Sequence, residues 1–160
     1  VCIYDIGEEV KNMGHTNVYS LLIDHIKYLD SAYKHYAAAV HDEGFRKFLN
    51  SMRGQEEANL DTVEGHAAEL KSYSAHTAAI SAVAQKLSTR GKDVRSLSEL
   101  GRIEFLEYML EIHRLSAELY QECESACQSE ATAEFLHSSR EDENRRIALL
   151  QDRYELEQLL

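Results

Sequence analysis

The chain has 160 residues, contains no proline and carries a formal charge of −11 at pH 7. So acidic a chain disfavours binding to nucleic acid or to an anionic membrane surface, because both select a basic protein face. No apolar run approaches the roughly 18 residues that a membrane span requires, and residues 1–6 lack the basic start and long apolar stretch of a signal peptide. At this length the chain is expected to form one domain, residues 1–160. Because proline cannot lie inside a helix, its absence predicts that this domain is built from a few long helices.

The chain is expected to open with a short lead-in, residues 1–14, that contains a helical turn or two at residues 8–13. The first long helix is predicted to begin near Thr16 or Asn17, both good N-caps, and to run to about Asp42. Its apolar residues recur in steps of three and four, which is the spacing of one buried helix face.

A tight turn at Gly44 is expected to lead into the second helix, residues 45–72. The two helices make up the first predicted hairpin, about residues 17–72. The inward face of the second helix is apolar except at Glu56, which lies in the middle of the apolar stripe. That glutamate is the first candidate for a functional group inside the protein.

A connecting segment, residues 73–95, follows the first hairpin. It is predicted to contain a short alanine-rich helix at residues 75–87 and a loop at residues 88–93. Small residues permit close helix approach, so the exposed part of residues 75–84 is a candidate contact surface, with packing inside the chain as the favoured alternative. Ser96 and Glu99 have the spacing of a capping box, which predicts that the third long helix begins there.

The third and fourth helices form the second predicted hairpin, about residues 96–158, with the fourth helix running from about Glu130 to Gln158. This hairpin repeats the first at an offset of 87 residues. Residues 48–56 and residues 135–143 agree at five of nine positions. A repeat of this length predicts an all-α four-helix bundle built from two related hairpins and joined by one long crossover.

Each hairpin has a tyrosine in its first helix, then a Phe-Leu pair, then a glutamate at a fixed distance in its second helix. These residues are Tyr33, Phe48, Leu49 and Glu56 in one copy and Tyr120, Phe135, Leu136 and Glu143 in the other. The pattern resembles the rubrerythrin-like branch of the ferritin-like superfamily over roughly residues 17–158. The resemblance implies a ferritin-like bundle that binds two iron or manganese ions through one glutamate and one Glu-x-x-His motif from each hairpin.

The chain departs from this ligand pattern at four of the six positions. The first-helix glutamates are replaced by Ile26 and His113, and the two histidines are replaced by Asn59 and Arg146. Isoleucine offers no lone pair, and the guanidinium of arginine stays protonated, so neither side chain can bind a metal. We therefore expect that the di-metal site is lost.

The substitutions also suggest what balances the two remaining glutamates. Arg146 and a protonated His113 supply two positive charges, and the amide of Asn59 adds a neutral donor. The sequence predicts an interior polar cluster in place of the metals. Its members are Glu56, Asn59, His113, Glu143 and Arg146.

These residues favour a non-enzymatic ferritin-like binding or interaction module in the cytoplasm, acting as a homodimer without a cofactor. The alternative is a divergent metal-binding oxidoreductase or peroxide-handling protein, which holds iron or manganese through Glu56, His113 and Glu143. A third hypothesis is a carrier of an unidentified small molecule in a pocket between helices. No glycine-rich phosphate loop or nucleophile motif indicates another kind of enzyme.

The remaining cysteine and histidine side chains are not expected to bind a metal. Cys123 and Cys127 are four residues apart on a predicted helix and are expected to be free thiols in a reducing cytoplasm. His25 and His41 are predicted to fall off the inward stripe, and His66 to lie at its edge, so none is expected to bind a metal.

Overall fold

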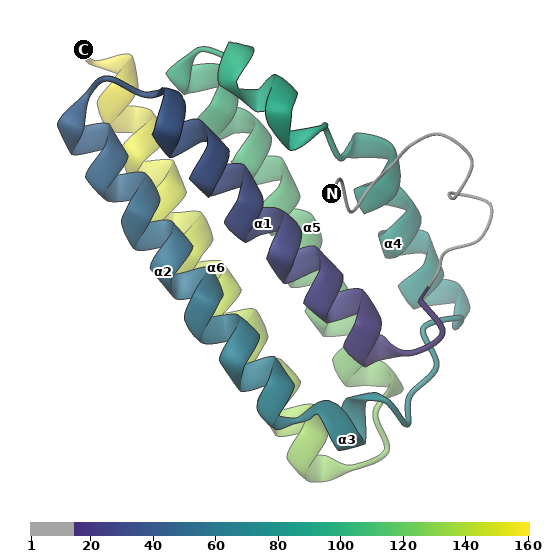
Figure 1. Ribbon diagram of the computed structural model, residues 1–160. Coiled ribbons are helices and arrows are strands. Elements are labelled where there is room, and N and C mark those ends of the chain that lie inside the picture. The colour runs from purple at the N-terminus through teal and green to yellow at the C-terminus, as the bar shows by residue number, and fades with distance from the viewer. Residues whose placement is uncertain (1–14) are drawn as a thin grey trace. The chain divides into compact units, whose positions relative to one another are not determined.

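The computed structural model describes residues 15–160 (Figure 1). The lead-in predicted at residues 1–14, with its helical turns at residues 8–13, lies outside the described residues. Apart from one isolated bridge, every element of the described part is a helix, which confirms the all-α class. The long helices pack in pairs, α1 with α2 and α5 with α6, consistent with a helical bundle.

The chain divides into two compact units. The first comprises the described residues up to Ser74 together with Lys92–Glu99, and the second comprises Ala75–Gly91 and Leu100–Leu160. Each predicted hairpin therefore has its own unit. The connecting segment is shared, because one part of it joins each unit.

The first unit opens with α1 (Val18–Ala39). The side chain of Asn17 accepts a hydrogen bond from the backbone N–H of Ser20 at 2.9 Å, which confirms the predicted N-cap. The helix ends at Ala39, before the predicted Asp42. The reason is that the Asp42 carboxylate caps the next helix, and its Oδ1 accepts from the Phe45 N–H at 2.6 Å.

The second helix of this unit is α2 (Glu43–Gly65). The tight turn predicted at Gly44 is wrong, because Gly44 lies in the first turn of α2. The helix is also shorter than predicted. It breaks at His66, whose φ of −106° and ψ of 15° leave the helical region, and a single turn, α3 (Ala67–Leu70), follows.

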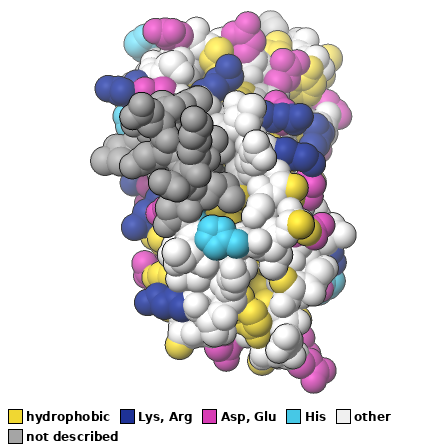
Figure 2. All heavy atoms as spheres, turned by 90° about the vertical axis from the view of Figure 1, so that its right-hand side faces the viewer, with side chains coloured by type: hydrophobic (Ala, Val, Ile, Leu, Met, Phe, Trp, Pro, Cys, Tyr) yellow, Lys and Arg dark blue, Asp and Glu magenta, His cyan; other side chains and the backbone are white. Residues whose placement is uncertain are grey.

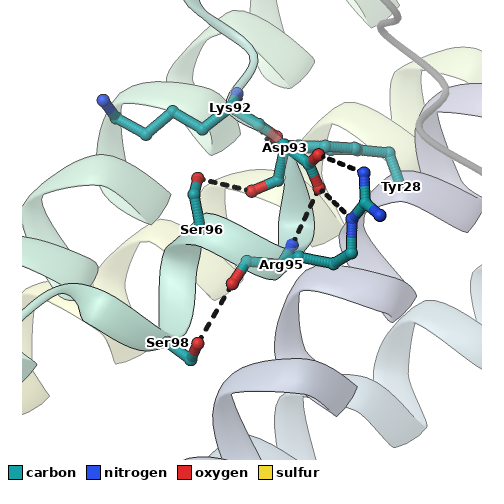
Figure 3. Close-up of polar contacts among 6 residues, drawn as sticks. All are labelled: Tyr28, Lys92, Asp93, Arg95, Ser96 and Ser98. Atoms are coloured by element: carbon teal, nitrogen blue, oxygen red, sulfur yellow. Dashed lines mark hydrogen bonds and ion pairs between the residues drawn. The ribbon is translucent and has the colours of Figure 1, made fainter.

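A short 3-10 helix, η2 (Val94–Glu99), completes the first unit by packing on α1. Figure 3 shows its anchor: the Tyr28 hydroxyl of α1 donates to the Lys92 carbonyl at 2.7 Å and accepts from the Lys92 N–H at 3.1 Å. The capping box predicted at Ser96 and Glu99 is wrong, because both residues lie in η2. The Ser96 hydroxyl donates instead to the backbone carbonyl three residues earlier, at 2.7 Å.

The second unit begins with α4 (Ala78–Arg90), which packs on α5 (Arg102–Ala126). The loop predicted at residues 88–93 is partly wrong, since α4 continues to Arg90. The apolar face of α4 is buried, and three of its alanines are exposed, so the candidate contact surface stays a prediction. The buried residues are Ile80, Val83, Ala84 and Leu87, and the exposed alanines are Ala78, Ala79 and Ala82.

The last helix is α6 (Glu130–Gln158), whose bounds agree with the prediction. It runs antiparallel to α5, because partners that lie later on α5 lie earlier on α6. These pairs are Arg102 with Glu157, His113 with Glu143, and Glu124 with His137. The start of α5 is fixed by the Glu104 carboxylate, which accepts from the Gly101 N–H at 2.9 Å.

On the face drawn in Figure 2, acidic and basic side chains lie close together, and hydrophobic side chains show as small separate areas. Interspersed charges of both signs are typical of a solvated surface. None of the helices within residues 15–160 is both long and apolar enough to cross a bilayer.

Candidate functional site

The second unit contains a buried ionic cluster formed by His113, Glu143 and Arg146. His113 Nδ1 lies 2.5 Å from Glu143 Oε1, and Arg146 Nη1 donates to Glu143 Oε2 at 3.0 Å. His113 and Glu143 are fully buried, and Arg146 is 5% exposed. Each oxygen of one carboxylate is therefore engaged by a different nitrogen donor.

Helix geometry brings the three side chains together. Glu143 and Arg146 are three residues apart on α6, so they are neighbours on one face of that helix. His113 lies on the buried stripe of α5, between Met109 and Ser116. Because α5 and α6 pair along their length, the imidazole meets the carboxylate across the helix interface.

The Glu143 carboxylate determines which groups donate hydrogen bonds in this cluster. An ionised carboxylate can only accept, so the His113 Nδ1 must carry its proton, in either the neutral or the charged imidazole. Arg146 is always protonated and has no acceptor lone pair. The cluster is thus one negative charge held by one permanent positive charge and one imidazole N–H.

This donor set does not fit the di-metal site that the family resemblance implies. A metal at Glu143 would have to displace the His113 hydrogen bond and the Arg146 ion pair from the two carboxylate oxygens. It would also lie beside a fixed guanidinium, which repels a cation and cannot ligate it. In the second unit, the residues favour a charge-balanced polar core over a metal centre.

In the first unit, Glu56 and Asn59 share the buried face of α2, where they are fully buried and 8% exposed. Ile26, the repeat equivalent of His113, is buried on α1. The structure therefore brings together three of the five predicted residues in one unit and places the other two on one helix face in the other. A single cluster of all five stays a prediction.

A third buried carboxylate, Glu157, was not predicted from the sequence. The side chain of Glu157, 1% exposed, lies 3.2 Å from Arg102 Nη1 and 2.5 Å from Arg153 Nη2. The spacing of Arg153 and Glu157, four residues on one helix, is a visible signal. The partner from α5 has no signal in the sequence, because only the pairing of α5 with α6 brings Arg102 near.

The burial of the cysteine and histidine side chains can be compared with the predictions made for them. Both cysteines of the described part, Cys123 and Cys127, are free, as predicted. Burial raises the pKa of the Cys123 thiol well above its usual range, so this thiol stays protonated at physiological pH. The prediction for His25 is wrong, because this side chain is 1% exposed on α1. α1 packs against both α2 and η2, so its buried face is wider than one stripe.

A scan against protein-family models finds no match for this chain. Searches of curated proteins and of solved structures find no match either. The resemblance to rubrerythrin-like proteins therefore rests on the repeated residues and the helices of this chain.

Proposed function

We propose that the protein is a ferritin-like four-helix bundle of the rubrerythrin-like kind, in which a charged hydrogen-bonded core replaces the di-metal site. In this proposal it acts as a non-enzymatic binding or interaction module and as a homodimer. The observation that carries the proposal is the Glu143 carboxylate, whose two oxygens are occupied by His113 and Arg146. An arginine at the position of a metal-binding histidine supplies the neutralising charge that a metal would otherwise supply.

The metal content of the protein tests this proposal. The chain is produced in medium supplemented with iron and manganese, and bound metal is measured by mass spectrometry. We expect much less than one ion per chain. About two ions per chain, as a ferritin-like di-metal site would bind, would contradict the proposal.

A gain-of-function variant sharpens the test. Arg146→His restores the Glu-x-x-His spacing on α6 and removes the guanidinium, so it is expected to bind more metal than the unaltered chain. Arg145→His is the matched control, because Arg145 is an exposed neighbour on the same helix. Equal metal binding by the two variants would show that the Arg146 position does not control metal affinity.

The alternative function is a divergent metal-binding oxidoreductase with ligands Glu56, His113 and Glu143. What supports it is that His113 and Glu143 are buried side by side and both are of the side-chain types that bind iron and manganese, although a metal there would replace the hydrogen bond between them. It predicts that ferrous iron in air produces the visible absorption of an oxo-bridged iron site. It also predicts that this absorption is lost in His113→Gln.

Size-exclusion chromatography with light scattering tests the homodimer. A mass of one chain over the whole accessible concentration range would contradict this part of the proposal.

A further inference from the structure

Large hydrophobic side chains are exposed on the second hairpin and, within residues 15–160, on no other part of the structure. One lies in the first turn of α5, two lie in the second half of α6, and two follow that helix. They are Ile103, Leu149, Leu156, Leu159 and Leu160. A single exposed leucine is normal on a protein surface, whereas a group of such side chains often marks an interaction site.

The exposed side chains within the two helices gather at one end of the hairpin. Arg102 Nη1 lies 3.2 Å from the carboxylate of Glu157, so the start of α5 lies beside the end of α6. Ile103 directly follows Arg102, and Leu156 directly precedes Glu157. Leu149 and Leu156 are seven residues apart, which places them on one face of α6 and about 10 Å apart along its axis.

The repeat shows that the fold does not require apolar side chains at these positions. The equivalent residues of the first hairpin, 87 positions earlier, are Thr16, Thr62 and Glu69. All three are exposed as well. Both hairpins therefore present these positions to solvent, and only the second hairpin occupies them with large apolar side chains. Packing within a hairpin does not explain this difference, whereas a binding partner of the second hairpin does.

The exposed charge around these apolar side chains is negative. Residues 102–107 and 149–158 contain five acidic residues and two arginines. Both arginines, Arg102 and Arg153, pair with the buried carboxylate of Glu157, at 3.2 and 2.5 Å. The other four acidic side chains are exposed, and they are Glu104, Glu107, Asp152 and Glu155. A complementary partner therefore carries positive charge beside its own apolar side chains.

We propose that this acidic apolar face, formed by Ile103, Leu149, Leu156 and the four exposed carboxylates, binds a basic amphipathic helix of another protein. Apolar residues seven apart on such a helix match the spacing of Leu149 and Leu156, and lysine or arginine beside them would meet the carboxylates. A second copy of this chain is a poorer match, because a two-fold pairing would bring the same carboxylates together. The inference rests on the proposed binding function and names a class of partner for it.

A labelled synthetic peptide tests the proposal. The probe has about 18 residues of leucine and lysine, with the leucines spaced three and four apart so that they form one helix face. The matched control has glutamate in place of every lysine. Fluorescence anisotropy with the full chain should show saturable binding of the lysine peptide and at least about tenfold weaker binding of the glutamate peptide. Equal binding of the two peptides would overturn the proposal.

The position of the bound peptide is a separate readout. In NMR spectra of the full chain, backbone amide shifts caused by the lysine peptide should concentrate at residues 103–107 and 149–156. These segments carry the exposed apolar and acidic side chains of the face. Shifts confined to other residues would contradict the assignment of the face.

A double variant tests the apolar contact. Leu149→Thr with Leu156→Glu gives α6 the residues of the first hairpin and adds a carboxylate, so attraction between charges alone would strengthen binding. We expect at least about tenfold weaker binding of the lysine peptide, because two apolar contacts are lost. Thr62→Ala with Glu69→Asp, at the equivalent exposed positions, is the matched control and should leave binding unchanged. Full affinity in the folded leucine variant would refute the contact.

A second pair of variants tests the charge. Asp152→Asn with Glu155→Gln removes two carboxylates of the face and should weaken binding of the lysine peptide about threefold or more at low salt. Asp61→Asn with Glu64→Gln removes two exposed carboxylates from α2 and should have a smaller effect. Equal losses in the two variants would mean that only the net charge of the chain attracts the peptide, and the proposed face would be wrong.

Light scattering distinguishes a separate partner from a second copy. The Leu149→Thr, Leu156→Glu variant should have the same mass in solution as the unaltered chain. If the variant is a monomer at concentrations where the unaltered chain is a dimer, another copy covers this face and the basic helix is the wrong partner. A failure of the peptide tests leaves the metal measurements of the proposed function untouched, so the two proposals can fail separately.

Discussion

The two hairpins place a glutamate at the same repeat position and surround it differently. In the second hairpin, His113 and Arg146 engage the two oxygens of Glu143. In the first, the equivalent positions are Ile26 and Asn59, and Glu56 borders a cavity. The comparison teaches that the repeat preserves the residues that build the helices, whereas the residues that set the local charge have diverged.

The accessory segments differ as well. α1 of the first unit is covered by η2, which is anchored through Tyr28, while α5 of the second unit is covered by the longer helix α4. The repeat equivalent of Tyr28 is Leu115, which has no hydroxyl with which to hold a backbone segment. The first helix of each hairpin therefore packs against a different accessory segment, α1 against η2 and α5 against α4.

Arg146→Met should cause the largest loss of stability. It removes the permanent positive charge beside the fully buried Glu143, and breaking one side of a buried ion pair typically costs about 3–5 kcal/mol. Urea unfolding followed by circular dichroism measures the change. Asn59→Met, the same substitution at the repeat position of the first hairpin, is the matched control and should cost less.

The double variant Glu143→Leu, Arg146→Met separates the charge from the packing. If the single variant is unstable because it strands a buried carboxylate, removing that carboxylate as well should recover much of the lost stability. A double variant as unstable as Arg146→Met would mean that the guanidinium acts through packing. In that case the charge difference between the hairpins would have little energetic weight.

Tyr28→Phe should have a medium effect on the first unit. The variant removes two hydrogen bonds to the backbone of Lys92 and keeps the ring, so we expect a loss of about 1–2 kcal/mol. Hydrogen exchange should quicken at residues 94–99. Tyr154→Phe is the control from the second unit, because the Tyr154 hydroxyl donates to Glu107 at an exposed site. Equal losses of stability in both variants would show that the Tyr28 hydroxyl contributes no more than the hydroxyl at the exposed site.

The sequence was sufficient where structure depends on neighbours along the chain. The bounds of α6 were predicted, and so was the cap of α1 at Asn17. The sequence was not sufficient at η2. Ser96 and Glu99 have the spacing of a capping box, but the hydrogen bond of Tyr28 to Lys92 holds this segment against α1 instead. The pairing of Glu143 with Arg146 followed from helix spacing.

Other features of the sites had no sequence signal. The burial of His25 depends on α1 having two packing partners, and the contact of Arg102 with Glu157 depends on how α5 and α6 pair. The cavity at Glu56 likewise reflects the space between α1 and α2, which residue spacing does not report.

The smallest expected effects depend on pH. One concerns the first unit and appears in acid, and the other concerns the second unit and appears in alkali. In the first unit, hydrogen bonds from Arg95 lower the pKa of Asp93 from 3.8 to about 2 (Figure 3). The folded-state pKa is depressed, so its contribution to stability is present above pH 3.8 and is lost as the pH falls through about 2. Asp93→Asn should therefore be slightly less stable than the unaltered chain at pH 6, and the difference should shrink as the pH falls toward 2.

The second unit should show the mirror effect in alkali. The hydrogen bond to Glu107 raises the pKa of Tyr154 above its usual value of 10.0, because ionisation would place a phenolate beside a carboxylate. A raised pKa means that the contribution is present below pH 10 and is lost as the pH rises further. Urea unfolding of Tyr154→Phe and the unaltered chain should differ slightly at pH 8 and converge above pH 10. Both sites are exposed and should be screened by salt, so a difference that persists in high salt at either end would point to a packing role instead.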